Sequence, residues 1–417
     1  MVLSPPGLPD FIPDIPLDRH ARETVRLLAS GGDERIVLDP ETGLNKYFSG
    51  PYPRVARAFA SSTANDMSRE AFARATELAA SPAGTYSDRM DGLRDRIRRA
   101  YRLGPDCRIV FAPSGTDLEY VALAAVAGQS PAGIHNILLG ADEVGSGCRL
   151  SAHGMYFAPT TGRGVAVTPG QRVAGLEQVS LVDIPVRCAK GLAHDSTTMA
   201  VHIRAEVQSA RAMGRRSLVH VVHGSKTGLI LPELPEIDDL LANERADVSL
   251  VVDACQARIT SEALHAYLDR GAIVFLTGSK FMGGPPFSGF ALVPPQAAER
   301  AGPLPVGLAQ LFRRAEWPHG WPGREQLDDD DNRGLWLRLE ASIFELERFQ
   351  ALPLGQVERI VESFQRALAR RSSENQCDLP LYPAPFFDGP RSRVNTRRAL
   401  KGFVIPRSGD EVPIASC

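Results

Sequence analysis

The chain has 417 residues, of which 43% are hydrophobic and 23% charged, and its net charge is -2. This balance gives no indication of a nucleic-acid or anionic-membrane partner, so we expect a small-molecule partner. The chain has no apolar stretch of 18 residues and no signal-peptide pattern at its start, which predicts a cytoplasmic protein. Its length exceeds what one core usually fills and predicts two domains.

The chain begins with a segment rich in proline, glycine and turn-forming residues, and we expect residues 1–50 to form an N-terminal arm that wraps around a larger body. The segments 68–80 and 88–104 then show apolar residues at helical spacing. Gly104 is expected to end the second of these helices.

From residue 108 onward, short apolar runs alternate with helical segments. The runs lie at 108–113, 136–140, 217–222, 248–253, 272–278 and 290–294. Alternation of this kind predicts an α/β fold with a mostly parallel sheet, in which ligands bind beyond the carboxyl ends of the strands. Two amphipathic helices at 334–350 and 356–371 then predict a small C-terminal domain. We therefore divide the chain into the arm, a large domain at 51–305 and a small domain at 306–417.

Three short motifs follow apolar runs. In the first, Ser114-Gly115-Thr116 begins a helix, where free N–H groups and hydroxyls suit a phosphate, although an ordinary helix cap is the alternative. In the second, Asp253 ends a buried run and precedes Gln256. A carboxylate in such a place requires a cation or hydrogen-bond donors.

The third motif is a turn of small residues that contains Lys280 between Thr277 and Gly284. The chain has only five lysines among its 47 basic residues, so few amines are available for chemistry. A lysine here could form an imine, bind a phosphate or point into solvent. We expect the glycines at 278, 283 and 284 to let the backbone approach a ligand closely.

The order and spacing of the three motifs resemble those of fold-type I pyridoxal-phosphate enzymes, the aspartate aminotransferase superfamily. The resemblance covers about residues 85–295 and is greatest to the class V aminotransferase and cysteine desulfurase branch. It implies a three-layer fold with a small C-terminal α+β domain, a homodimer, and pyridoxal 5'-phosphate as the cofactor. By this resemblance, Lys280 would hold the cofactor as a Schiff base and Asp253 would pair with its ring nitrogen.

The resemblance also implies the other contacts to the cofactor. Ser114, Gly115, Thr116, Thr277 and Ser279 would bind its phosphate, and Gln256 would donate a hydrogen bond to its 3-oxygen. The family's histidine that stacks on the ring is missing. Instead, the ring face is expected to be formed by Glu143 or Val144, or by His153 or Tyr156 from the next turn.

A further departure concerns the run at 217–222, after which the family commonly has an asparagine. Ser225 takes that place here, and His223 beside it could act as an acid or base or be a structural residue. Lys226 is the rival amine, with a contact to a substrate anion as its minor hypothesis. The nearest cysteine to the desulfurases' mobile-loop cysteine is Cys377, which has no recognisable loop around it.

The substrate side of the site is predicted from the two ends of the chain. The family's substrate carboxylate is usually held by an arginine of the small domain, and Arg393 is favoured here over Arg391, Arg397 and Arg398. Asn45 and Tyr47 of the arm are expected to contact the substrate. No metal is expected, because the acidic run at 328–331 is consecutive and reads as a solvated loop.

These features together predict an enzyme that acts on an amino-acid-type substrate, most simply an aminotransferase, in a specialised biosynthetic pathway. The alternatives are a lyase and a β- or γ-replacement or carbon–carbon bond-forming enzyme that uses the same cofactor. A rival from another class is a catalytically silent binding protein that keeps the fold. The retention of Lys280, Asp253 and Gln256 together argues against that rival.

Overall fold

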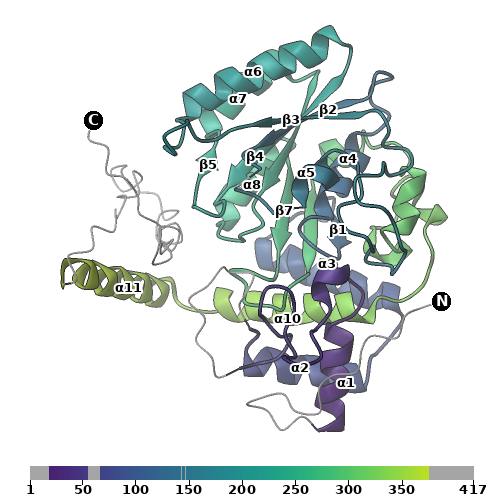
Figure 1. Ribbon diagram of the computed structural model, residues 1–417, viewed down its shortest axis with the longest axis vertical. Helices are drawn as coiled ribbons and strands as arrows, with labels where there is room; N and C mark the ends of the chain where they lie inside the picture. Colours follow the sequence, from purple (N-terminus) through teal and green to yellow (C-terminus); the bar gives the residue numbers. More distant parts are fainter. Residues whose placement is uncertain (1–17, 55–65, 142, 146, 375–417) are drawn as a thin grey trace.

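A computed structural model of the protein describes residues 18–54, 66–141, 143–145 and 147–374 (Figure 1). Arg391, Arg393, Arg397, Arg398 and Cys377 lie outside these residues. None of the helices in the described ranges is both long and apolar enough to cross a membrane.

The centre of the molecule is an eight-stranded sheet with the order β1-β8-β7-β6-β4-β2-β3, in which the short β5 pairs with β4. The neighbours from β7 through β6, β4 and β2 to β3 pair in parallel, whereas β8 is antiparallel to both β1 and β7. The predicted α/β fold with a mostly parallel sheet is thus confirmed. The strands are β1 (Arg108–Ala112), β2 (Ile134–Leu139), β3 (Val179–Ile184), β4 (Arg216–His223), β5 (Ile230–Leu231), β6 (Val248–Asp253), β7 (Ile273–Thr277) and β8 (Gly289–Val293).

Helices cover the sheet on both faces, which explains why its strands are apolar throughout (Figure 1). One face packs against α4, and the other packs against α3, α6, α7, α8 and α10. The α-helices are α1 (Arg19–Leu28), α2 (Arg69–Ala80), α3 (Tyr86–Tyr101), α4 (Leu118–Val126), α5 (Cys148–Ala152), α6 (Ser196–Ala212), α7 (Leu234–Glu244), α8 (Ser261–Asp269), α9 (Pro295–Ala298), α10 (Arg333–Gln350) and α11 (Leu354–Glu374). Single turns of 3-10 helix include η1 (Glu34–Ile36), η3 (Val306–Gln310), η4 (Arg314–Glu316) and η5 (Arg324–Gln326).

The two helices predicted before the first strand are present, but the second one ends earlier than expected. Helix α3 begins at a capping box, in which Thr85 and Asp88 each bond the other's backbone. It ends at Tyr101, and Arg102 rather than Gly104 takes the left-handed conformation with φ of 56°. The arm also contains helix α1, which the sequence did not predict.

The C-terminal part of the described chain is helical. Helix α10 packs against α1, α2 and α3, and its buried Arg338 donates to the carbonyls of Leu28 and Gly31 at the end of α1 and to that of Phe287. No strand occurs in residues 306–374. The division into a large domain and a small α+β domain at residue 306 stays a prediction, because residues 375–417 lie outside the described chain.

Candidate active site

The three predicted motifs meet at the carboxyl ends of β1, β6 and β7. A Cβ atom added to Gly115 would lie 2.9 Å from Cγ2 of Thr277 and 3.3 Å from Sγ of Cys255. The hydroxyl of Thr277 donates to the carbonyl of Cys255 at 2.7 Å. The turn at 114–116, the segment after Asp253 and the Lys280 turn are therefore in direct contact, and Gly115 is small because a neighbouring turn lies against it.

Asp253 and Lys280 both lie near the buried thiols of Cys148 and Cys255. Oδ1 of Asp253 accepts from the N–H of Cys255 at 2.9 Å, which fixes the carboxylate at the end of β6. Burial and then Asp253 raise the pKa of the Cys255 thiol, and Lys280 opposes them. The same two side chains also act on the pKa of Cys148, which burial raises. The carboxylate and the amine thus lie within electrostatic range of one pair of cysteines.

Small residues from the loop after β2 close over the first motif. A Cβ atom on Gly145 would lie 3.5 Å from Oγ1 of Thr116, and one on Gly147 would lie 3.0 Å from its Cγ2. The N–H of Asp117 donates to Oγ of Ser114 at 3.3 Å, so Ser114 closes the turn before α4. The N-cap of α4 is Asp117, which makes no side-chain cap bond, and Ser114 is therefore not the helix cap considered as the alternative. The N–H groups of Gly115 and Thr116 find no acceptor within the described residues and are left for a ligand.

Two glycines of the Lys280 turn lie against helix α10. A Cβ atom on Gly278 or on Gly284 would lie 2.1 Å from Oγ of Ser342 in α10. Gly283 has a φ of 79° and open space around its Cα. Gly278 and Gly284 therefore allow close packing against a helix, and their approach to a ligand stays a prediction.

Glu143 and Ser225 lie together, as their places after neighbouring strands predict. Oε2 of Glu143 accepts from the hydroxyl of Ser225 at 2.6 Å and from the N–H of Thr227 at 3.0 Å, and Arg187 pairs with Oε1 at 2.7 Å. Although burial raises it, these hydrogen bonds hold the pKa of Glu143 below its usual range. The carboxylate joins the two loops, and its contact with a cofactor ring stays a prediction.

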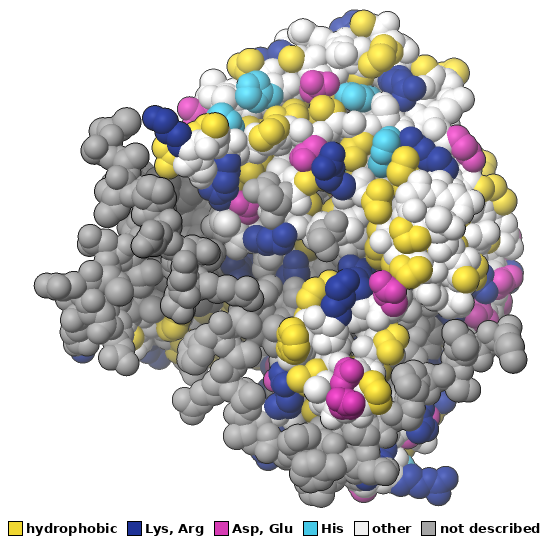
Figure 2. All heavy atoms as spheres, viewed as in Figure 1, with side chains coloured by type: hydrophobic (Ala, Val, Ile, Leu, Met, Phe, Trp, Pro, Cys, Tyr) yellow, Lys and Arg dark blue, Asp and Glu magenta, His cyan; other side chains and the backbone are white. Residues whose placement is uncertain are grey.

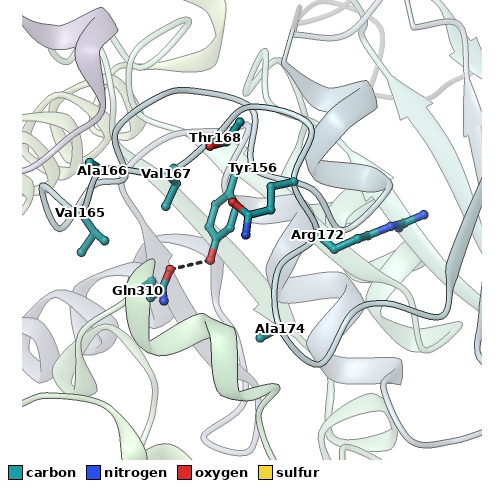
Figure 3. Close-up of a pocket in the computed structure, with 9 residues that line it drawn as sticks. Tyr156, Val165, Ala166, Val167, Thr168, Arg172, Ala174 and Gln310 are labelled. Atoms are coloured by element: carbon teal, nitrogen blue, oxygen red, sulfur yellow. Dashed lines mark hydrogen bonds between the residues drawn. The ribbon is translucent and has the colours of Figure 1, made fainter.

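Two of the four candidates for the ring face are engaged elsewhere. Nε2 of His153 lies 2.9 Å from the guanidinium of Arg172. The hydroxyl of Tyr156 donates to Gln310 at 2.7 Å and lines a cavity of about 460 Å³ that includes none of the three motifs (Figure 3). Contact with a cofactor ring stays a prediction for all four candidates.

The other predicted substrate contacts have structural partners. Nδ1 of His223 lies 3.0 Å from the hydroxyl of Tyr267, and the two rings meet edge to face. Oδ1 of Asn45 accepts from the N–H of Tyr47 at 2.8 Å and so forms a turn in the arm. Tyr47 itself lies against Phe287, with 6.1 Å between the ring centres. Contact with a substrate stays a prediction for all three.

No protein-family model matches the sequence, and no curated protein matches it significantly. Among solved structures, the chain is similar to the apo cysteine desulfurase from Thermococcus onnurineus NA1, with 16% identity and a TM-score of 0.49 over 75% of this chain and 72% of that chain. It is also similar to a NifS-like protein, with 12% identity and a TM-score of 0.49 over 76% of this chain and 75% of that chain. For the histidinol-phosphate aminotransferase from Clostridium acetobutylicum, the identity is 10% and the TM-score 0.41, over 77% of this chain and 76% of that chain. Similarity at this level assigns no activity to the chain.

An arginine of the arm reaches the first motif, and sequence reasoning missed it. Nη2 of Arg35 donates to Oγ of Ser114 at 3.1 Å, and Nη1 donates to Oγ1 of Thr116 at 3.3 Å. The guanidinium carbon of Arg35 lies over the ring of Phe157, 4.8 Å from the ring centre. The sequence offered no spacing signal for this contact, because Arg35 lies 79 residues from Ser114.

A buried acid and a buried histidine lie beside Asp253. Glu119 of α4 and His220 of β4 are each 1% exposed, with 3.5 Å between Oε2 and Nε2. Burial and then the charge of Asp253 raise the pKa of Glu119 well above its usual value. Burial lowers the pKa of His220 to about 4. His220 is therefore uncharged at neutral pH and gives Asp253 no ionic partner.

The remaining charged side chains near the site include no cluster of metal-ligand type among the described residues. Within the described residues, no group of three or more His, Cys, Asp or Glu side chains could hold a metal ion. Figure 2 shows Lys and Arg side chains gathered around the hollowed middle of the face that Figure 1 presents. The acids at 328–331 are exposed, as expected of a solvated loop, and several of them pair with arginines, such as Asp328 with Arg163 at 2.7 Å.

Proposed function

We propose that the protein is a pyridoxal-phosphate-dependent enzyme that acts on an amino-acid-type substrate. The observation that supports this most is the contact of three turns at neighbouring strand ends, which supply an amine, a carboxylate and a turn with free N–H groups. A cofactor with an aldehyde, a basic ring nitrogen and a phosphate requires this set of groups. When bound, it supplies a ring that withdraws electrons from the substrate's α-carbon.

In this proposal each residue has one task. Nζ of Lys280 would hold the cofactor through its aldehyde carbon, and the free amine would move the proton at the substrate's α-carbon. The Asp253 carboxylate keeps a proton on the ring nitrogen, because a nearby negative charge favours the protonated form. Gly115 and Thr116 donate their N–H groups to the phosphate, with Ser114, Thr277 and Ser279 beside them. Gln256 donates to the ring oxygen.

The role of Lys280 can be tested by trapping the cofactor. Borohydride reduction of the protein saturated with pyridoxal phosphate should attach the cofactor irreversibly to Lys280, and peptide mass spectrometry should locate it there. Lys280→Ala should abolish both the adduct and turnover. Lys226→Ala is a matched control, because Lys226 also follows Gly-Ser. An adduct on Lys226, or turnover by Lys280→Ala, would contradict the proposal, and no adduct on any lysine would favour the silent binding protein.

We propose aminotransfer as the reaction, with a lyase, a replacement or a carbon–carbon bond-forming reaction as the alternatives, in a cytoplasmic homodimer. A panel of amino acids added to the cofactor-loaded protein should identify the substrate class by the change in cofactor absorbance. An aminotransferase should convert one of them to its keto acid without added acceptor, once per site. Release of ammonia instead would indicate a lyase. Light scattering at micromolar concentration should give twice the mass of one chain.

A further inference from the structure

Arg35 is held in a fixed orientation by its own segment. It lies in η1, and its Nε and Nη2 atoms donate to the two carboxylate oxygens of Asp33, each at 2.7 Å. Asp33 in turn caps η1 by accepting from the N–H of Arg35. The side chain of Arg35 is only 11% exposed. A bidentate pair of this kind fixes the plane of the guanidinium as well as its position.

Two aromatic rings complete the enclosure of Arg35. The guanidinium carbon lies 4.8 Å from the ring centre of Phe157 and 5.4 Å from that of Phe287. Although burial lowers it, Asp33 holds the pKa of Arg35 above its usual value, so the guanidinium stays charged. Arginine stacked on aromatic rings keeps its donors free along the edges of the plane.

One edge of Arg35 faces the first motif and still has a donor to offer. A guanidinium has five N–H groups, of which Asp33 takes two and the hydroxyls of Ser114 and Thr116 take one each. One N–H of Nη1 remains. Because Thr116 accepts from Arg35, its own O–H is free to donate, and it has no acceptor among the described residues. With the N–H groups of Gly115 and Thr116, four such donors lie at this one turn.

We propose that Arg35 binds an oxyanion at the turn 114–116, either the phosphate of the cofactor or the carboxylate of the substrate. If the substrate carboxylate is the ligand, Arg35 has the task that the sequence assigned to Arg393. The inference rests on the proposed function for the identity of the anion but not for its chemistry. Hydrogen-bond donors and a cation at one turn fit an oxygen anion whatever molecule carries it.

The first experiment measures the anion site without any cofactor. Calorimetric titration of the cofactor-free protein with inorganic sulfate should show binding that Arg35→Gln weakens about tenfold or more. Arg35→Lys should weaken it less, because it keeps the charge and loses the fork. Arg270→Gln is the matched control, since Arg270 makes the same bidentate pair, with Asp238, at 2.7 Å and 2.7 Å. It should bind sulfate as the unchanged protein does.

Two further titrations distinguish the sources of the anion. If the cofactor phosphate is the ligand, Arg35→Gln should raise the dissociation constant for pyridoxal phosphate about tenfold and leave that for pyridoxal unchanged. If the substrate carboxylate is the ligand, cofactor affinity should persist, and the preference for an amino acid over the corresponding amine should be lost. Each result supports the proposal with a different ligand.

A folded Arg35→Gln protein that binds sulfate, cofactor and amino acid with unchanged affinity would overturn the proposal. If the variant loses its helical circular dichroism because Asp33 is left buried and unpaired, the double variant Asp33→Asn with Arg35→Gln removes that charge and repeats the test. Failure of Lys280 to bind the cofactor would refute the proposed function and leave the sulfate result standing.

Discussion

Asp117 is the acid whose charge would oppose an anion at the turn 114–116. Burial and the charge of Asp33 raise its pKa to about 7, although the Ser114 hydroxyl and Arg35 act in the other direction. The charged groups around it are Asp33 and Arg35 from η1 and Glu316 from η4. Near neutral pH, Asp117 is therefore close to the midpoint between its charged and uncharged forms.

This titration predicts how anion binding depends on pH. Sulfate keeps its charge between pH 6 and pH 8, whereas Asp117 becomes negative over that range. Sulfate should therefore bind about fivefold more tightly at pH 6 than at pH 8. Asp117→Asn, which keeps an acceptor for Ser114, should show tight binding at both pH values. Calorimetric titration checks this, and an equal pH dependence in the variant would exclude Asp117 as the cause.

Sequence reasoning predicted the residues that follow strands and missed those that come from elsewhere. Lys280, Asp253 and the turn at Ser114 were predictable because a polar group at the end of an apolar run has few explanations. Arg35 was not predictable, because its partners depend on how the arm folds back. The alternatives for the ring face stayed open for a similar reason, since the direction of His153 is set by a contact with Arg172.

Helix α4 and strand β4 contribute Glu119 and His220, which give the stability of the protein two opposing pH dependences. Burial raises the pKa of Glu119 in the folded protein well above its ordinary value of 4.5, so the free energy of unfolding falls as pH rises above 4.5. His220 stays neutral until about pH 4, whereas its unfolded pKa is near 6.5. The free energy of unfolding therefore also falls as pH drops below 6.5.

Removing the charge of Glu119 should remove one of these dependences. Glu119→Gln keeps the shape of the side chain and cannot ionise in the unfolded chain. We expect it to raise the free energy of unfolding by about 2 kcal/mol at pH 8 and by much less at pH 5. Chemical denaturation at the two pH values is the measurement, with the exposed Glu299→Gln as control. An equal effect at both pH values would show that Glu119 is ionised in the folded protein.

The contact between the Lys280 turn and α10 makes a separate prediction. Gly278→Ala would place a methyl group on Oγ of Ser342, so we expect the free energy of unfolding to fall by about 3 kcal/mol. Adding Ser342→Gly should restore part of that loss, because it removes the obstructing atoms. Thermal denaturation of the two single variants and the double variant measures the coupling. Additive effects would mean that the two residues do not touch.

Elements with a clear period were predicted well, whereas their ends and directions were not. The helix over 68–80 is present as Arg69–Ala80. The run at 290–294 is present as β8, but its antiparallel direction was not predicted, although only residues 278–288 separate it from β7. Such a segment is too short for the crossover that a parallel neighbour needs. Helix α1 was missed because the prolines before it made the whole arm look irregular.

At the scale of the whole molecule, the sheet could be predicted from the alternation of apolar runs with helical segments, because strands that are buried on both faces are apolar throughout. The domain division could not be tested in this way. The described residues 306–350 pack on the same two cores as the sheet, and most of their contacts are with elements far away in the chain. No compositional change marks such contacts.

Arg338 connects helix α10 to the segment just before Arg35. It is fully buried, and its guanidinium satisfies carbonyls of Leu28 and Gly31, just before the segment that carries Arg35. These carbonyls precede residue 338 by about 300 residues, so during synthesis they gain this partner only after the whole sheet has been made. The segment that carries Arg35 therefore depends for this support on a residue made much later.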